Sequence, residues 1–226
     1  MSVGFLLEHL PRLLGGLWLT LQLLALALAA GGIIALLCAL AWRSPLLPLR
    51  WLVRGYTFFF RGTPLIAQIF LVYYGAGQFS GELRELGLWT VLREAYWCAI
   101  ITFALNTGAY TAVIVRGALD AIPRGQIEAG RSLGFTRWQV VRLVLWPQAL
   151  RVGLPAYGNE VIYMLKGTAV ASTITLFDLM GVARTIYASS FQFDVYLAAA
   201  ILYVAVAALI TWGLRRLEAR LQVPGL

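Results

Sequence analysis

Long apolar stretches separated by short basic segments dominate the pattern of this chain. A helix that crosses the roughly 30 Å hydrocarbon core of a bilayer needs about 20 apolar residues. Three stretches meet that requirement clearly, at about residues 13–42, 96–115 and 195–214. The pattern therefore predicts an all-α integral membrane protein.

A further apolar stretch, between the first two clear spans, is interrupted by arginine, glycine and proline. Thr63 can act as the N-cap of a helix whose first residue is Pro64, because a threonine hydroxyl accepts hydrogen bonds from first-turn N–H groups and proline fits the first helical position. We therefore expect the second span at about 64–80, after a short interfacial segment.

The stretch at about 155–176 has low hydropathy because it carries Glu160 and Lys166. Its flanking segments nevertheless favour a fourth span here. With this span, the sequence predicts five transmembrane helices in one domain that covers residues 1–226.

Basic residues are concentrated in alternate connecting segments. The segments 43–62 and 116–152, together with the C-terminal tail, hold 13 of the 18 Lys and Arg residues. The segments between them, 78–95 and 177–194, sum to a net charge of −2. Because cytoplasmic loops are enriched in Lys and Arg, this asymmetry predicts that the N-terminus lies outside and the C-terminus inside.

Composition supports the membrane assignment and argues against other classes of protein. Hydrophobic residues make up 61% and charged residues 12% of the chain, against about 45–50% and 25% in soluble domains. The net charge of +8 is a topology signal here, so we expect no nucleic-acid partner. Cys38 and Cys98 lie in apolar stretches and His9 stands alone, so we expect neither a disulfide framework nor a metal site.

The loop at 120–151 is too polar to cross the membrane and too regular for a passive tether. Its pattern predicts a first short helix that Pro123 opens and Gly134 ends. A second helix is expected to start at Thr136 and to be disturbed at Pro147. Glycines flanking so short a helix allow close approach by a partner, while its periodicity equally fits an amphipathic helix on the membrane surface.

This loop resembles the EAA loop of ABC-importer permease subunits, in which Glu-Ala-Ala is followed by Gly after three residues and by Ile-x-Leu-Pro after nine more. The spacing matches throughout, with Gly130 in place of the second Ala, Val144 in place of Ile and Trp146 in place of Leu. The matching segments are Glu128-Ala129-Gly130, Gly134 and Val144-Leu145-Trp146-Pro147.

Three further segments resemble the polar-amino-acid subfamily of these permeases, with the histidine, arginine and octopine group the most similar. They are Phe60-Arg61-Gly62-Thr63-Pro64-Leu65, Leu105-Asn106-Thr107-Gly108-Ala109-Tyr110 and Leu154-Pro155-Ala156-Tyr157-Gly158-Asn159-Glu160. Together with the loop, they cover most of the chain in the order of the family.

The resemblance implies a permease dimer, of identical or homologous chains, in the cytoplasmic (inner) membrane of a bacterium. It also implies two cytoplasmic ATPase subunits, an extracytoplasmic solute-binding protein and an amino acid substrate. The EAA helix would couple the permease to the ATPase through Glu128, Ala129, Gly130, Gly134 and Pro147.

ATP chemistry is expected on the partner. A P-loop requires a lysine after glycine and before Ser or Thr, and the only lysine of this chain is Lys166, which lies in a membrane segment before glycine. We therefore expect no catalytic residue and no bound cofactor in this chain, with ATP and Mg on the ATPase subunit.

Polar residues at membrane depth are the candidates for the substrate pathway, because such groups are costly there and usually face an aqueous path or a partner. An amino acid needs an acid for its ammonium group and a cation or amide donors for its carboxylate. The candidates are Asn106, Thr107, Tyr110, Glu160 and Lys166. They favour a cationic or zwitterionic substrate.

Purely structural roles for the same residues remain open at this point. Glu160 can pair with Lys166 or Arg151, and Asn106 and Tyr110 can serve as interhelical hydrogen-bonding groups. The rival function is a self-contained secondary transporter that uses Glu160 for proton coupling, although the paired repeats of that class are not evident. An intramembrane enzyme is disfavoured because no histidine lies at comparable depth.

Overall fold

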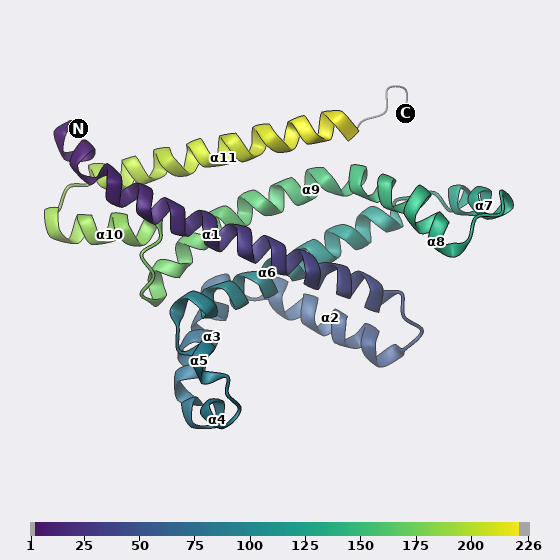
Figure 1. Ribbon diagram of the computed structural model, residues 1–226, viewed down its shortest axis with the longest axis horizontal. Helices are drawn as coiled ribbons and strands as arrows, with labels where there is room; N and C mark the ends of the chain where they lie inside the picture. Colours follow the sequence, from purple (N-terminus) through teal and green to yellow (C-terminus); the bar gives the residue numbers. More distant parts are fainter. Residues whose placement is uncertain (1–2, 222–226) are drawn as a thin grey trace.

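The computed structural model describes residues 3–221, within which every regular element is a helix. Helix α1 (Val3–Trp42) crosses α6 (Ala95–Asp120), and α11 (Asp194–Leu221) runs along one edge of the molecule (Figure 1). These three helices are long and apolar enough to cross a membrane. They contain the three clear spans that hydropathy predicts.

Helices α2 (Leu47–Gly62) and α3 (Leu65–Gln78) are separated by a break at Thr63 and Pro64. The predicted cap was wrong: Pro64 occupies the N-cap position of α3, and no side chain caps that helix. The Thr63 hydroxyl instead donates to the Phe59 carbonyl, at 2.8 Å. The residue before a proline is extended, so the backbone N–H of Thr63 leaves the helix. The hydroxyl therefore bonds the Phe59 carbonyl in its place.

The expected short interfacial segment is also longer than predicted, since α2 is a complete helix of 16 residues. It has arginines on one side, while Trp51, Leu52 and Phe58 are exposed. Helix α2 is therefore amphipathic, with one basic and one apolar face.

A continuous helical run leads through α8 (Arg137–Gln139), the π-helix η1 (Val140–Leu145) and α9 (Trp146–Gly167), and ends in the 3₁₀-helix η2 (Thr168–Ile174). The expectation that Pro147 disturbs the second loop helix is confirmed, since the turn before it is a π-helix, although the helical run continues through it. Proline clashes with a carbonyl in the preceding turn of an α-helix. Here the preceding turn is a π-helix, whose wider spacing accommodates it.

Helix α10 (Leu179–Ser190) follows η2 after a bend of 49°, and the pair fits a broken span or a re-entrant loop. Asp178 starts α10 by accepting from the backbone N–H of Gly181, at 3.1 Å. The Thr20 hydroxyl on α1 accepts from the Leu179 N–H, at 3.1 Å. These bonds fix the bend against α1.

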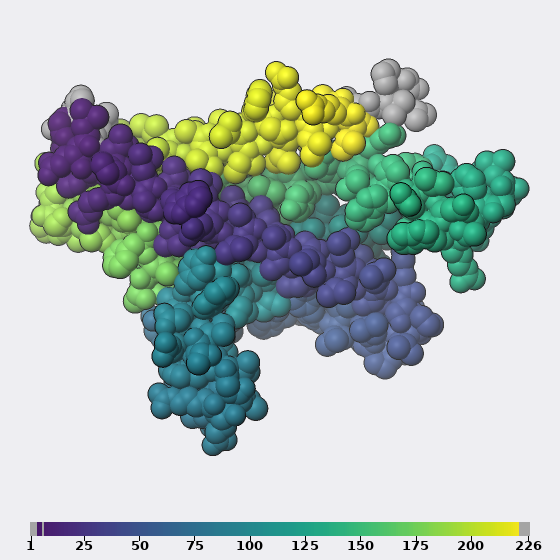
Figure 2. All heavy atoms as spheres, in the orientation of Figure 1, coloured from purple at the N-terminus to yellow at the C-terminus, as the bar shows by residue number. Residues whose placement is uncertain are grey.

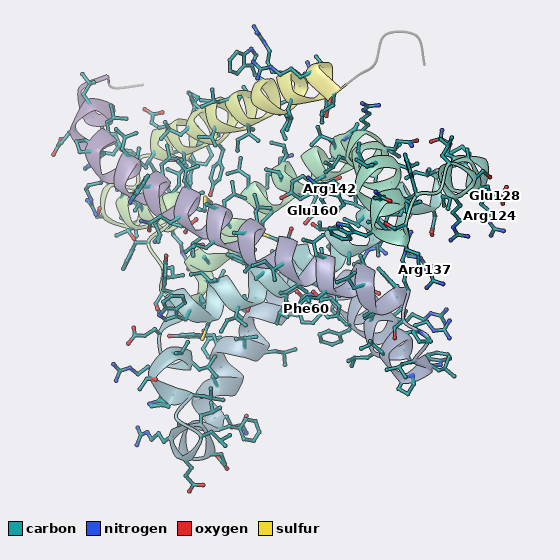
Figure 3. All side chains as sticks on the ribbon, turned by 45° about the vertical axis from the view of Figure 1, so that its right-hand side comes forward. Phe60, Arg124, Glu128, Arg137, Arg142 and Glu160 are labelled. Carbon is teal, nitrogen blue, oxygen red and sulfur yellow. The ribbon has the colours of Figure 1, made fainter. Side chains whose placement is uncertain are left out.

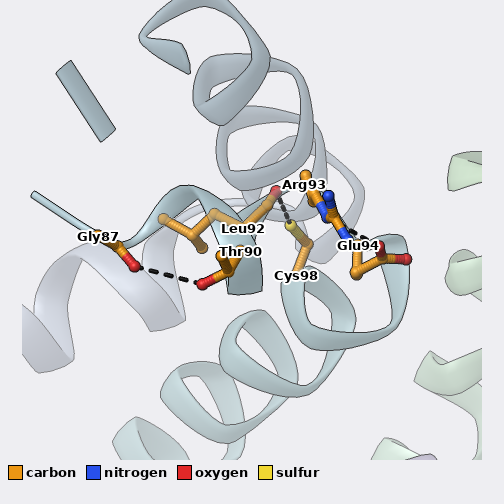
Figure 4. Close-up of polar contacts among 6 residues, drawn as sticks. All are labelled: Gly87, Thr90, Leu92, Arg93, Glu94 and Cys98. Carbon is orange, nitrogen blue, oxygen red and sulfur yellow. Dashed lines mark hydrogen bonds and ion pairs between the residues drawn. The ribbon is translucent and has the colours of Figure 1, made fainter. Parts of the chain in front are cut away.

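The short helices α4 (Ser80–Glu85) and α5 (Trp89–Leu92) form a lobe with α3 that projects from the body of the molecule (Figures 1 and 2). The Cys98 thiol on α6 donates to the Leu92 carbonyl, at 3.2 Å, and ties α5 to the start of α6 (Figure 4). The Thr90 hydroxyl donates to the Gly87 carbonyl, at 3.3 Å.

Close packing of α1 on α6 sets the position of the polar residues of α6. A Cβ atom at Gly31 would collide with the Thr107 methyl group and lie 3.1 Å from the Ala104 carbonyl oxygen. Glycine at this position therefore permits the close approach. The main core cluster, which includes Leu23, Phe103 and Leu165, is buried where α1, α3, α6 and α9 meet.

Candidate functional site

A cavity of about 590 Å³ opens between α3, α6 and α9. Polar side chains from three parts of the sequence line this cavity, which lies at the break between α2 and α3. The lining residues are Thr63, Pro64, Leu65, Asn106, Tyr110, Ile114, Ala156, Asn159, Glu160, Tyr163 and Met164. Three of the five predicted pathway residues, Asn106, Tyr110 and Glu160, thus face one cavity.

Asn106 is held by a hydrogen-bond network to the α2–α3 break. Its amide nitrogen donates to Gln68 Oε1, at 2.9 Å, and to the Phe60 carbonyl, at 3.3 Å. Gln68 in turn donates to the Phe60 carbonyl, at 2.9 Å, and to the Thr63 hydroxyl, at 2.8 Å. Because both donors of the Asn106 amide are used, its carbonyl oxygen is the group left for a ligand.

Glu160 projects from α9 and is only 6% exposed. Its carboxylate faces the hydroxyl of Thr107 on α6 and the guanidinium group of Arg61 on α2. The Thr107 hydroxyl is buried and lacks a hydrogen bond of standard geometry. Thr107 therefore supports Glu160 from behind rather than lining the cavity.

Arg61 does not line this cavity, but it is stacked against Tyr110, which does. Its guanidinium group is 5.3 Å from the centre of the Tyr110 ring, and the Tyr110 hydroxyl donates to the Arg61 carbonyl, at 3.4 Å. A cation over an aromatic face is stabilised by the ring quadrupole. The cavity therefore combines a carboxylate, an amide acceptor and a nearby cation.

Lys166 is the candidate that the structure separates from the others. It is exposed on α9 and does not line the cavity. Within residues 3–221, no ion pair joins Glu160 to Lys166 or to Arg151. The structural interpretation, in which Glu160 forms an ion pair with one of these two residues, was wrong.

Sequence reasoning missed Gln68, Asn159 and Tyr163. Gln68 is 2% exposed and is the single polar side chain in the apolar turns that open α3. An isolated amide in an apolar helix is the signal that marks it, because a buried amide needs partners. Asn159 and Tyr163 lie one residue before Glu160 and three residues after it on α9 and carried no such signal.

The predicted coupling loop forms a compact hairpin at one end of the molecule, with α7 (Arg124–Ser132) followed by α8. Gly134 has a φ of +81°, a conformation that favours glycine after a helix end. Thr136 caps α8 through a reciprocal capping box with Gln139. The predicted end of the first helix and start of the second are confirmed.

The hairpin has a buried base and an exposed tip. Gly130 is buried, and its Cα lies so close to η1 that a Cβ would contact Phe135 and Val140 at 3.5 Å. Glu128 and Ala129 are exposed, and Figure 3 places Glu128 beside Arg124 at the tip. The side of α7 that carries Glu128 is therefore free for a partner.

Comparison with known families agrees with the four segments singled out in the sequence. The model of the family described as "Binding-protein-dependent transport system inner membrane component" matches residues 17–223. The octopine transport system permease protein OccM of Rhizobium meliloti is 44% identical over 218 residues, which cover 93% of this chain and 89% of that protein.

Other relatives are similar over the same region. The nopaline transport system permease protein NocM of Agrobacterium fabrum is 40% identical, covering 90% of this chain and 85% of that protein. The arginine ABC transporter permease protein ArtM of Escherichia coli K12 is 39% identical, covering 93% and 95%.

The fold is also similar to that of solved structures. A chain from the crystal structure of an amino acid ABC transporter with histidines superposes with a TM-score of 0.84 at 32% identity, covering 97% of this chain and 99% of that one. A chain of the inward-facing MetNI methionine ABC transporter gives a TM-score of 0.75 at 22% identity, over 99% of this chain and 100% of that one, and shows the shared fold.

Proposed function

The chain belongs to the family of binding-protein-dependent transport system inner membrane components, and from that premise we propose that it is the permease subunit of an ATP-driven importer of a polar amino acid. Relatives named for octopine, nopaline and arginine transport support this substrate class. All three names denote molecules with a guanidinium group, for which the acceptors in the cavity are suited.

We propose that the subunit crosses the bacterial inner membrane five times, with its N-terminus outside. In this arrangement α2 and α3 together make the second crossing, and α9 with η2 makes the fourth. The clustering of arginines at the ends of α1, α2, α6 and α11 supports the orientation. The lobe of α4 and α5 then faces the outside, where a solute-binding protein docks.

The observation that carries the proposal is the meeting of Glu160 and Asn106 at one cavity, with Arg61 stacked on the ring of Tyr110, which also lines it. Glu160 and the Asn106 carbonyl oxygen offer acceptors for an ammonium or guanidinium group, and Arg61 offers a cation for the α-carboxylate. Leaving either charge of the substrate unpaired at membrane depth is costly. A site with both signs therefore suits a polar amino acid.

Energy for transport is expected from separate subunits. The exposed tip of α7, with Glu128 and Ala129, is proposed to seat in a cytoplasmic ATPase, which binds ATP and Mg. A second permease chain, identical or homologous, completes the pathway. Because Gly130 on α7 packs beside Val140 and Val144 of η1, which continues into α9, we expect a movement of α7 to pass to the helix that carries Glu160.

The test is reconstitution in proteoliposomes. We expect ATP-dependent accumulation of labelled arginine or histidine when the permease, the ATPase subunit and the binding protein are present together, and none when any one of them is omitted. Accumulation by the permease alone, driven by a proton gradient, would instead establish a secondary transporter. Uptake of glutamate in preference to arginine would refute the proposed substrate class.

A further inference from the structure

A second polar cavity lies far from Glu160 in the sequence, where the ends of α1 and α6 meet the start of α2. It has a volume of about 240 Å³. Its lining includes four arginines and a single acidic residue, Asp120, which gives it a formal charge of +3. The arginines are Arg43, Arg50, Arg54 and Arg116.

Two N–H groups in this cavity are buried without an acceptor, the Nε of Arg50 and the indole Nε1 of Trp42. Nearly all buried donors in folded proteins have a partner. The one carboxylate present already accepts from Arg116, with 3.4 Å between Asp120 Oδ2 and the arginine Nε. The segment 43–62 contains no Asp or Glu that might supply another acceptor.

The cavity is therefore an arrangement of hydrogen-bond donors that suits an anion. Guanidinium groups bind phosphate oxygens in a bidentate way. Trp42 is held in place by Arg116, whose guanidinium carbon lies 5.0 Å from the centre of the indole ring. This contact fixes the indole edge, so that its N–H keeps its direction when no ligand is present.

An apolar cavity of about 230 Å³ lies beside it, between α1, α6 and α9. Gly32, Ala35 and Leu36 line the apolar cavity, whereas Ala39 and Arg43 line the arginine cavity. These α1 residues recur every three or four positions and share one face of the helix. The two cavities follow each other along α1, with the arginines nearer its C-terminal end.

The order of the two cavities along α1, apolar and then basic, matches the order of acyl chains and headgroups in a membrane leaflet. From Leu36 to Arg43 the helix rises roughly 10 Å at about 1.5 Å per residue, which is the depth over which acyl chains give way to headgroups. The arginines lie at the end that the proposed orientation places in the cytoplasm. Basic pockets between spans at that surface recognise anionic headgroups.

We propose that these adjoining cavities bind an anionic phospholipid, with its phosphate held by Arg50, Arg54 and the Trp42 N–H, and with an acyl chain along Gly32 and Leu36. The arginine cavity shares no lining residue with the substrate cavity, and the proposal does not depend on which amino acid is transported.

The experiment measures the thermal unfolding midpoint of the purified, delipidated complex during titration with phosphatidylglycerol, phosphatidylcholine or inorganic phosphate. We expect phosphatidylglycerol to raise the midpoint and the other two to have little effect. Arg50→Gln is expected to raise the half-maximal lipid concentration about tenfold, the loss typical of one charge-assisted hydrogen bond. Arg220→Gln, an exposed arginine on α11, serves as the control and should respond like the wild type.

Two further variants keep the test decisive if Arg50→Gln fails to assemble. Trp42→Phe retains a ring for Arg116 but removes the N–H, and should weaken phosphatidylglycerol binding. Gly32→Leu places a side chain in the apolar cavity from a position where the added Cβ meets no atom within 4 Å, and should also weaken phosphatidylglycerol binding. Equal responses to phosphatidylglycerol and phosphatidylcholine, equal stabilisation by inorganic phosphate, or variants that respond like Arg220→Gln would each overturn the proposal.

Discussion

Asn106 on α6 and Gln68 on α3 share a hydrogen bond of 2.9 Å between Asn106 Nδ2 and Gln68 Oε1, although 38 residues separate them in the chain. Gln68 also donates to the Phe60 carbonyl in the last turn of α2 and to the Thr63 carbonyl in the α2–α3 break. The bond thus links the break in the second proposed span to the polar face of the third. It fixes which end of the Asn106 amide faces the cavity.

The first prediction follows from this link. Gln68→Leu removes the acceptor of Asn106, so that the amide is free to turn and no longer presents its oxygen to the substrate. We expect the KM for arginine uptake by the reconstituted complex to rise about fivefold, in line with one lost hydrogen bond of about 1 kcal/mol. Labelled uptake at saturating binding protein measures it.

The control for this variant is Gln148→Leu, because Gln148 donates only to the Val144 carbonyl of its own helical run. It removes an amide of the same size without touching the cavity. If Gln68→Leu lowers the stability of the complex but leaves the KM at the value of the control, Gln68 supports the helix break alone and does not position Asn106.

The second prediction concerns the approach of α1 to α6. Gly31→Val places a side chain against the Thr107 methyl group and the Ala104 carbonyl, and overpacking of this kind costs about 1–3 kcal/mol. We expect a lower thermal unfolding midpoint for the purified complex. Gly15→Val is the matched change on the same helix, since its Cβ meets no atom within 4 Å. Equal midpoints for the two variants would contradict the proposed packing.

The sequence predicted the elements that depend on local pattern, and it failed where the outcome depends on distant partners. Gly134 and Thr136 were correctly assigned as the end and start of loop helices, because φ preference and capping are local properties. The Thr63 hydroxyl was assigned to the wrong helix, since its partners, Phe59 and Gln68, lie on both sides of a break.

The candidate site shows the same division. The i, i+4 spacing placed Asn106 and Tyr110 correctly on one face of α6. Lys166 is charged and deep in a span, but depth alone does not say which side of α9 a residue faces. Its side chain lies outside the cavity that Asn106, Tyr110 and Glu160 line, and its place in the pathway stays a prediction. The lone amide of Gln68 in the apolar start of α3 signals a buried polar contact, but the sequence does not show that the partner is Asn106 on α6.

The third prediction tests the coupling loop. Gly134→Leu should reduce ATPase stimulation and uptake at least tenfold, because the side chain would project from the exposed hairpin into the ATPase groove. The substitution also strains the backbone at a φ of +81°, by about 1–2 kcal/mol. ATP hydrolysis and uptake are measured together in proteoliposomes.

Gly87→Leu separates strain from coupling. Gly87 has a φ of +71°, also has open space around its Cβ, and lies in the lobe of α4 and α5. This variant carries a similar strain and should retain ATPase stimulation in the assembled complex. Loss of activity to the same extent in both variants would mean that backbone strain, rather than contact with the ATPase, explains the effect of Gly134→Leu.

The last prediction concerns Glu160, the only acidic residue lining the cavity within the described part of the chain. Glu160→Gln keeps the shape and the contact with Thr107 but removes the negative charge that faces the substrate cation. A lost charge-assisted hydrogen bond typically costs about 1.5–3 kcal/mol, or roughly 10- to 150-fold in affinity. We expect a rise of that size in the KM for arginine, measured at saturating binding protein so that the selectivity of the binding protein does not mask it. Glu94→Gln is the control, because Glu94 is an exposed carboxylate paired with Arg93, at 3.1 Å, on the lobe side of the molecule. If the Glu160→Gln complex assembles normally and transports arginine with the KM of the control, Glu160 is structural, and the cavity conducts the substrate without recognising its charge.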